Sequence, residues 1–328
     1  RGREHRCRTD QGHAHAQRLG AQGLLLPGRT QLAAKIRAAG GAVFIEQALA
    51  AIAIPAGRRA GYQHFGSHGL ALQPVHQRTR QIDPAAPQQL ASRGGPAPIG
   101  NWGTGQVHHV TPENAGWTYV GFDLWKSAPG ETVTGGLDDK EVCLVFVSGK
   151  GRVTVDGVDL GELGQRMSPF DGPAYAVYAP AGAKWQVIAT TDLELAVCLA
   201  PGKPGSHPTR VITPDSIEKL SRGKGTNTRY PSNILPEDHP ADSLLVVEVI
   251  TPGGHTSSYP SHRHDEDDLP RQSLLEETYY HRMSKPQGFG FQRVYTDDRS
   301  LDETMLIEDG DVVLVPRGYH PVAAVHGY

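Results

Sequence analysis

Short runs of strand-forming residues, separated by glycine and proline turns, fill the chain from about residue 105 to its end. Residues 141–147 and 243–250 are the clearest of these runs, since both are rich in valine and are followed closely by glycine. The 39 glycines and 25 prolines suit the many turns that such short strands require. Short strands at this spacing predict jelly-roll barrels. We therefore expect an all-β fold with two jelly-roll barrels.

The chain divides into four segments by composition. We expect an extraneous or disordered basic segment at 1–100, a first barrel at 101–205, a linker at 206–241 and a second barrel at 242–328. Residues 214–220 of the linker could form a helical turn.

Residues 1–100 differ sharply in charge from the rest of the chain. They carry 13 basic and 4 acidic side chains, whereas the other 228 residues carry 19 basic and 31 acidic ones. Arginine, alanine, glutamine, glycine and proline dominate, and such a mixture offers little apolar surface to bury. We expect translated sequence upstream of the true start; the alternatives are a basic tail that touches nucleic acid and a small extra domain. Only residues 30–39 and 43–54 could form a short helix or strand, and His13-x-His15 is expected to bind no metal.

Composition excludes several classes of protein. The three cysteines, Cys7, Cys143 and Cys198, lack the paired spacing of a disulfide framework or a zinc finger. The longest apolar stretch, residues 48–56, is too short to span a membrane, and no secretory signal is recognisable. A net charge of −3 gives no reason to expect a polyanion as partner. We predict a cytoplasmic protein that binds neither nucleic acid nor membrane.

Two separated histidine motifs predict a metal site in the second barrel. His262 and His264 are two residues apart, a spacing that places both imidazoles on one face of a strand. His320 closes the motif Pro-x-Gly-x-His that follows the apolar run 311–315. Together they resemble the two metal half-motifs of a cupin barrel. Three histidines and one carboxylate would suit a divalent transition metal with positions open to substrate.

Two carboxylates compete for the fourth position. Strict cupin spacing would offer Asp268, which belongs to the acidic run 265–268 and lies close to a proline in a turn. We favour Glu277, because it lies at the beginning of a strand on which Glu277, Tyr279 and His281 share one face.

The first barrel lacks these ligands. Residues 134–137 read Thr-Gly-Gly-Leu where a His-x-His motif would be needed, and Trp185 stands where the last histidine would fall. A tryptophan fills a barrel but ligates no metal. We expect this barrel to be a scaffold and a dimerisation partner for the other barrel.

Residues 222–230 of the linker carry basic and polar side chains, among them Arg222, Lys224 and Arg229. A solvated linker and a role in anchoring an acidic substrate are equally compatible with this composition.

Several long motifs, in order along the chain, resemble the 5-deoxy-glucuronate isomerases, the bicupins of inositol catabolism. The matching segments are residues 116–122, 257–265, 275–282, 291–300 and 309–322. The resemblance runs from about Gly105 to Tyr328 and covers nothing in residues 1–100. Family members continue beyond the position of Tyr328, so we expect a fragment that lacks the last strand of its second barrel.

The resemblance implies conversion of 5-deoxy-D-glucuronate to 2-deoxy-5-keto-D-gluconate, an aldose–ketose isomerisation. His262, His264, Glu277 and His320 would be the metal ligands, and the metal could be zinc, manganese or iron. The proton must move between adjacent carbons, and His281 and Tyr279 are the candidates for the base. Arg293, then Arg282, would bind the substrate carboxylate, with Tyr295 beside them.

Two other functions stay open at this point. An iron-dependent cupin dioxygenase would use the same ligand set, and a bicupin could bind a sugar acid without catalysis. A homo-oligomer is possible.

Overall fold

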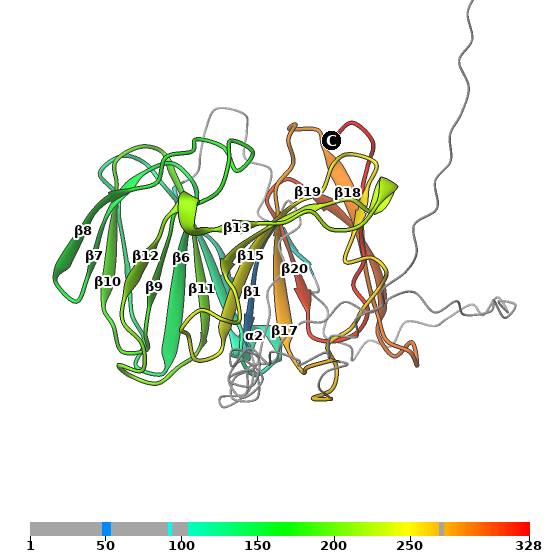
Figure 1. Ribbon diagram of the computed structural model, residues 1–328, viewed down its shortest axis with the longest axis horizontal. Helices are drawn as coiled ribbons and strands as arrows, with labels where there is room; N and C mark the ends of the chain where they lie inside the picture. Colours follow the sequence, from blue (N-terminus) through cyan, green and yellow to red (C-terminus); the bar gives the residue numbers. More distant parts are fainter. Residues whose placement is uncertain (1–47, 54–90, 94–103, 269–271) are drawn as a thin grey trace, which may run out of the picture.

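The computed structural model describes residues 48–53, 91–93, 104–268 and 272–328, and Figure 1 shows two neighbouring β-barrels. Helical turns in this part of the chain are short: α2 (Pro112–Ala115), η1 (Pro214–Ser216) and η2 (Gly225–Asn227). The fold is all-β, as the sequence predicted. None of the helices within the described residues has the length and apolar character needed to cross a membrane.

The first barrel consists of two facing antiparallel sheets. One has the order β12-β9-β6-β11-β4-β3 and the other the order β5-β10-β7-β8. Their strands are β3 (Gly105–Val110), β4 (Gly121–Ser127), β5 (Thr132–Gly135), β6 (Lys140–Ser148), β7 (Gly151–Val155), β8 (Val158–Leu163), β9 (Ala176–Ala179), β10 (Trp185–Ala189), β11 (Leu193–Pro201) and β12 (Arg210–Ile212).

Trp185 fills this barrel from β10, as expected from its position in the sequence. It is 5% exposed, and a Cβ atom on the paired Gly135 would lie only 2.3 Å from its ring. Only glycine leaves room for the indole at this point. The first barrel is thus packed with apolar side chains. Among the residues that the structure describes, the histidine cluster belongs to the second barrel.

The second barrel has the same two-sheet plan. One sheet has the order β13-β14-β15-β1-β17-β20-β2 and the other β16-β21-β18-β19. Their strands are β1 (Ala48–Ala53), β2 (Ala91–Arg93), β13 (Glu218–Lys219), β14 (Tyr230–Leu235), β15 (Leu244–Ile250), β16 (Thr256–Ser257), β17 (Glu276–His281), β18 (Phe289–Tyr295), β19 (Asp302–Glu308), β20 (Asp311–Val315) and β21 (Val322–Ala324).

The strand β1 occupies the place in the second barrel that β11 has in the first. In the first barrel, β11 lies between β4 and β6; in the second, β1 pairs with β15 on one side and β17 on the other. The edge strand β2 also comes from the N-terminal hundred residues. Here the structure departs from the expectation that residues 1–100 stand apart from both barrels. β1 lies within residues 43–54, where the sequence allowed a short helix or strand, whereas residues 30–39 and His13-x-His15 fall outside the described residues.

The predicted linker also contributes strands. β12 joins the first barrel, whereas β13 and β14 join the second, and η1 lies where the sequence suggested a helical turn. The segment therefore ties the barrels together by backbone pairing.

Two glutamates, related by the common plan of the barrels, connect them reciprocally. Glu141, on β6, accepts hydrogen bonds from three backbone N–H groups at the start of β15. Glu276, the first residue of β17, accepts three from the segment that leads into β4. Each carboxylate satisfies donors of the other barrel, and one cluster of buried apolar side chains spans both. The barrels therefore form one packed unit.

Deleting residues 48–53 should destabilise the second barrel by about 3 kcal/mol or more, because β15 and β17 would both lose a paired neighbour. Thermal unfolding and light scattering would measure the loss and the accompanying aggregation. Deletion of residues 13–18 is the length-matched control. Equal stability of the two deletion variants would contradict the pairing.

Candidate metal centre

Three histidines from two separate loops converge in the second barrel. His262 and His264 lie between β16 and β17, and His320 lies between β20 and β21. Their ligand nitrogens all lie within 4.8 Å of one another. His264 and His320 are buried and His262 is half-buried. Residues 262–264 form a loop and not the strand that we expected, yet both rings still reach the same cluster.

Glu277 brings a carboxylate into this cluster. It is 1% exposed. Its Oε1 lies 3.1 Å from Nε2 of His264, and its Oε2 lies 3.5 Å from Nε2 of His320. Asp268, the alternative carboxylate, lies in a short turn where its backbone exchanges hydrogen bonds with Gln272. The geometry therefore favours Glu277 as the fourth donor.

Backbone carbonyls fix two of the rings. Nδ1 of His320 lies 2.9 Å from the carbonyl oxygen of Gly318, and the ring of His262 hydrogen-bonds the carbonyl of Pro260. A carbonyl oxygen only accepts, so each ring donates there and turns its other nitrogen to the cluster. Nε2 of His320 and both oxygens of Glu277 are buried with no hydrogen-bond partner among the described residues. Buried acceptor atoms without donors fit a bound cation.

The electrostatics of the cluster also fit a metal ion. Loss of hydration and the neighbouring ring of His320 lower the pKa of His262 to about 3. The pKa of His264 lies well below its ordinary value, mainly because of its loss of hydration. Burial raises the pKa of Glu277, while the neighbouring His320 acts in the opposite direction. Neutral imidazole is the form that coordinates a metal, and a buried carboxylate needs a cation to stay charged.

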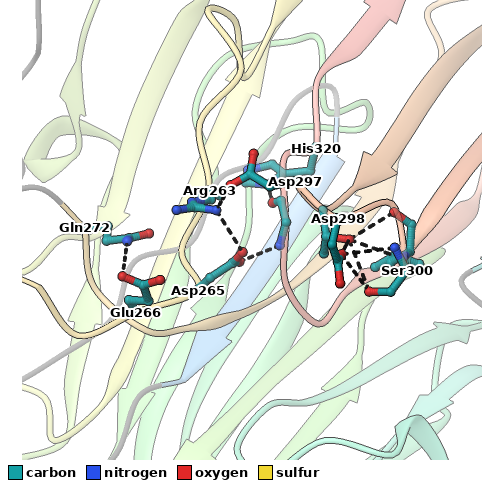
Figure 2. Close-up of polar contacts among 11 residues, drawn as sticks. Arg263, Asp265, Glu266, Gln272, Asp297, Asp298, Ser300 and His320 are labelled. Atoms are coloured by element: carbon teal, nitrogen blue, oxygen red, sulfur yellow. Dashed lines mark hydrogen bonds and ion pairs between the residues drawn. The ribbon is translucent and has the colours of Figure 1, made fainter. Parts of the chain in front are cut away.

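The residues interleaved with the histidines hold the two ligand loops together (Figure 2). Oδ1 of Asp265 accepts a hydrogen bond of 2.5 Å from the backbone N–H of Gly318. Arg263 pairs with Asp297, in the turn after β18, and its guanidinium lies 4.0 Å from Asp265. The Asp265 hydrogen bond fixes the loop of His264 against the loop of His320, and the Arg263 pair fixes it to the turn after β18.

Replacing Asp265 with asparagine should lower metal affinity by about 10- to 100-fold, the range found for groups that orient metal ligands. The Gly318 N–H would lose its charged acceptor, so the hydrogen bond that holds the loop of His320 would be weaker. Competition with a chelating dye measures the affinity. Glu266→Gln is the matched control, since Glu266 is exposed and bonds Gln272. If both variants lost metal affinity equally, the effect would come from the negative charge of this region and not from the Asp265–Gly318 hydrogen bond.

Comparison with known proteins gives the family. A model of the KduI/IolB family matches residues 99–328, more than half of the chain. The chain belongs to the KduI/IolB family. It is similar to the 5-deoxy-glucuronate isomerase of Geobacillus kaustophilus (strain HTA426), with 53% identity over 225 residues, 68% of this chain and 81% of that protein. The 5-deoxy-glucuronate isomerase of Bacillus subtilis (strain 168) is 45% identical over 68% of this chain and 82% of its own length.

The solved structure of an IolB-like protein has the same fold. The crystal structure of an IolB-like protein from Salmonella typhimurium LT2 superposes with a TM-score of 0.69 and 51% identity. The match covers 73% of this chain and 89% of that one.

In this KduI/IolB-family site, Tyr279 and His281 extend along β17 from Glu277, on the face that the sequence predicted. The Tyr279 ring centroid lies 5.9 Å from that of His320 and 6.0 Å from that of His281, and its hydroxyl lies 3.2 Å from Ser258 Oγ. Tyr279 therefore adjoins the histidine cluster, and His281 lies one inward-facing position farther along the strand.

Gln292 is a site residue that sequence reasoning missed. It is fully buried on β18; its Oε1 lies 2.9 Å from His281 Nε2, and its Nε2 donates to the backbone oxygen of His320. The sequence held no signal for this position, because in β18 the apolar Phe291 is exposed and the polar Gln292 is buried, the reverse of the usual preference.

The three residues assigned to the substrate carboxylate have other partners. Arg282 binds Glu194 and Asp309, whereas Arg293 forms a bidentate pair with Asp302 and is half exposed. Tyr295 stacks on Tyr319, with Arg293 and Arg299 over its ring. Neighbouring acids therefore engage both guanidinium groups, which weakens the prediction that either one binds substrate.

Proposed function

We propose that this protein interconverts 5-deoxy-D-glucuronate and 2-deoxy-5-keto-D-gluconate in myo-inositol catabolism. The observation that carries the proposal is the cluster of three histidines and Glu277, in a chain about half identical to proteins named 5-deoxy-glucuronate isomerase. An aldose–ketose isomerisation moves one proton between adjacent carbons through an enediol, so the site must stabilise a developing negative oxygen.

We assign His262, His264, Glu277 and His320 as ligands of one divalent ion: zinc, manganese or iron. When bound, such an ion would act as a Lewis acid toward the carbonyl and hydroxyl oxygens of the sugar. The carbonyl groups of Pro260 and Gly318 hold two of the rings, and Asp265 holds the loops together.

Tyr279 is our first candidate for the proton transfer, because its hydroxyl adjoins the cluster and has Ser258 Oγ at 3.2 Å to orient it. His281 is the second candidate. Its Nε2 donates to Gln292, so its Nδ1 would be the basic nitrogen of the neutral ring.

A cytoplasmic location accords with the two buried free thiols, Cys143 and Cys198. The proposal also includes a homo-oligomer, but it assigns no residues to the interface between subunits.

The test compares the full chain with a His262→Ala/His264→Ala variant. The parent should bind about one metal per chain, as one complete ligand set requires, and convert the deoxy-uronate without consuming oxygen. The variant should lose both properties. Oxygen uptake without isomerisation would indicate an iron dioxygenase. Binding of the sugar acid without turnover would indicate a non-catalytic bicupin.

A further inference from the structure

A cavity lies at one end of the first barrel, where β4 and β6 end and β11 begins. Its volume is about 230 Å³, and Ser127, Ser148 and Leu193 contribute to its lining. Ser127 is paired with Leu193, whose side chain belongs to the apolar core of this barrel. Ser148 lies two positions after Phe146, another residue of that core. Both serine side chains therefore point inward at the mouth of the barrel.

Neither serine hydroxyl has a hydrogen-bond partner among the residues that the structure describes. Ser127 is only 6% exposed and Ser148 only 7%. A serine hydroxyl can donate one hydrogen bond and accept two, and burying it without any of them costs free energy. Two such groups in the lining of one cavity indicate a ligand that carries hydrogen-bonding groups of its own.

The opposite end of this barrel is filled by an indole. On β10, Trp185 lies at that end and is 5% exposed, whereas Ala189 pairs with Gly151, close to the end of β6. The register between β6 and β11 shifts beside Glu194, the residue opposite Ser148. Such bulges are frequent at the rims of barrels, where they change the direction of a side chain. The space left for a ligand is therefore at the end marked by Ser148.

The rim of the cavity carries two charged side chains and a flexible apolar one. The turn after β6 packs closely on Asp192, since a Cβ at Gly149, which has a φ of +88°, would lie 2.0 Å from the Asp192 backbone oxygen. Lys126 also lines the cavity, and its charge is opposite to that of Asp192. Met167, 54% exposed, adds a thioether that can adapt to the shape of a ligand. A rim without net charge favours a neutral ligand over an anion or a cation.

We infer that this cavity binds a small neutral polyol. The hydroxyl groups of Ser127 and Ser148 and the carboxylate of Asp192 would hydrogen-bond its hydroxyl groups. Leu193 and Met167 would contact its carbon chain. A cavity of roughly 150 Å³ holds benzene, so a volume of about 230 Å³ provides room for about nine non-hydrogen atoms. This is close to the size of a four-carbon polyol such as erythritol. The inference does not depend on the metal centre of the second barrel.

Saturation-transfer NMR on the full chain tests the inference with erythritol. We expect a dissociation constant on the order of 1 mM, the scale for a ligand of this size. Ser127→Ala and Ser148→Ala should each weaken binding about 3- to 10-fold, as expected for one lost hydrogen bond. 1,4-Butanediol, which lacks the inner hydroxyl groups of erythritol, should bind about tenfold more weakly or worse. Ser221→Ala, at an exposed position outside the first barrel, is the matched control.

Two measurements separate loss of binding from loss of folding. The serine variants should unfold at the same temperature as the parent, because their hydroxyl groups bond no protein group. Ala128→Met should abolish erythritol binding, because Ala128 is a half-buried residue of the lining and methionine would fill the space. Each of four results would overturn the inference: no binding of erythritol by the parent, equal affinity for 1,4-butanediol, losses in the serine variants no larger than in Ser221→Ala, or erythritol binding by folded Ala128→Met.

Discussion

Replacing Glu277 with glutamine should remove at least about 99% of the bound metal at limiting metal concentration and lower isomerase activity by about a thousandfold or more. The amide keeps the volume of the carboxylate but supplies no negative charge to the cation. Its NH₂ group would also face Nε2 of His264 or His320, which now contact the carboxylate at 3.1 and 3.5 Å. Metal analysis after dialysis and an isomerase assay at matched metal concentrations measure the two effects.

The adjacent Glu276 provides the control. It differs from Glu277 by one position on the same strand, and its side chain points to the other barrel, where it accepts three backbone N–H groups. Glu276→Gln should therefore lower stability by about 1–3 kcal/mol, the cost of buried donors left unpaired, and retain the metal. Loss of metal in both variants, or in neither, would contradict the assignment of Glu277.

The metal-free proteins should differ in their pH dependence. Burial raises the folded-state pKa of Glu277 above the ordinary value of 4.5, so its protonated form is favoured in the fold. The metal-free parent should lose stability as the pH rises through this raised pKa, because the buried carboxylate then ionises. Glu277→Gln lacks this ionisation and should be the more stable metal-free protein at neutral pH.

The contrast between Glu276 and Glu277 shows what sequence reasoning could reach. A period of two along β17 was sufficient to place Glu277, Tyr279 and His281 on one face and Glu276 on the other. The two histidine half-motifs likewise predicted a cluster whose members lie 58 positions apart at most, between His262 and His320. Local periodicity therefore predicted which face of β17 carries Glu277, but it wrongly placed His262 and His264 on a strand.

Long-range partners could not be predicted in this way. Nothing near Arg282 in the sequence indicates that Glu194, on the other barrel, binds it, because that contact depends on how the barrels pack. The position of β1 is similar. Its six residues, Ala-Leu-Ala-Ala-Ile-Ala, carry no alternation, so their pairing between β15 and β17 follows only from the topology of the sheet.

Arg166→Met should destabilise the protein by about 3–5 kcal/mol, the range for breaking a buried ion pair from one side. Arg166 and Glu248 have side-chain exposures of only 2% and 9%, and the guanidinium binds the carboxylate through two hydrogen bonds of 2.7 and 2.6 Å. It also donates to the carbonyl oxygens of Val147 and Gly172, so it links the first barrel to β15 of the second. Methionine would leave Glu248 charged and buried without a partner.

A double variant tests whether this cost comes from the orphaned charge. Arg166→Met/Glu248→Leu should be more stable than Arg166→Met alone, because two apolar side chains of similar size can replace a buried pair at little net cost. Arg152→Met is the control, since the Arg152–Asp159 pair is exposed on both sides and should contribute little. Denaturant midpoints followed by tryptophan fluorescence give the comparison. A double variant as unstable as Arg166→Met would indicate instead that the cost comes from lost hydrogen bonds to carbonyl oxygens within the first barrel, which methionine cannot make.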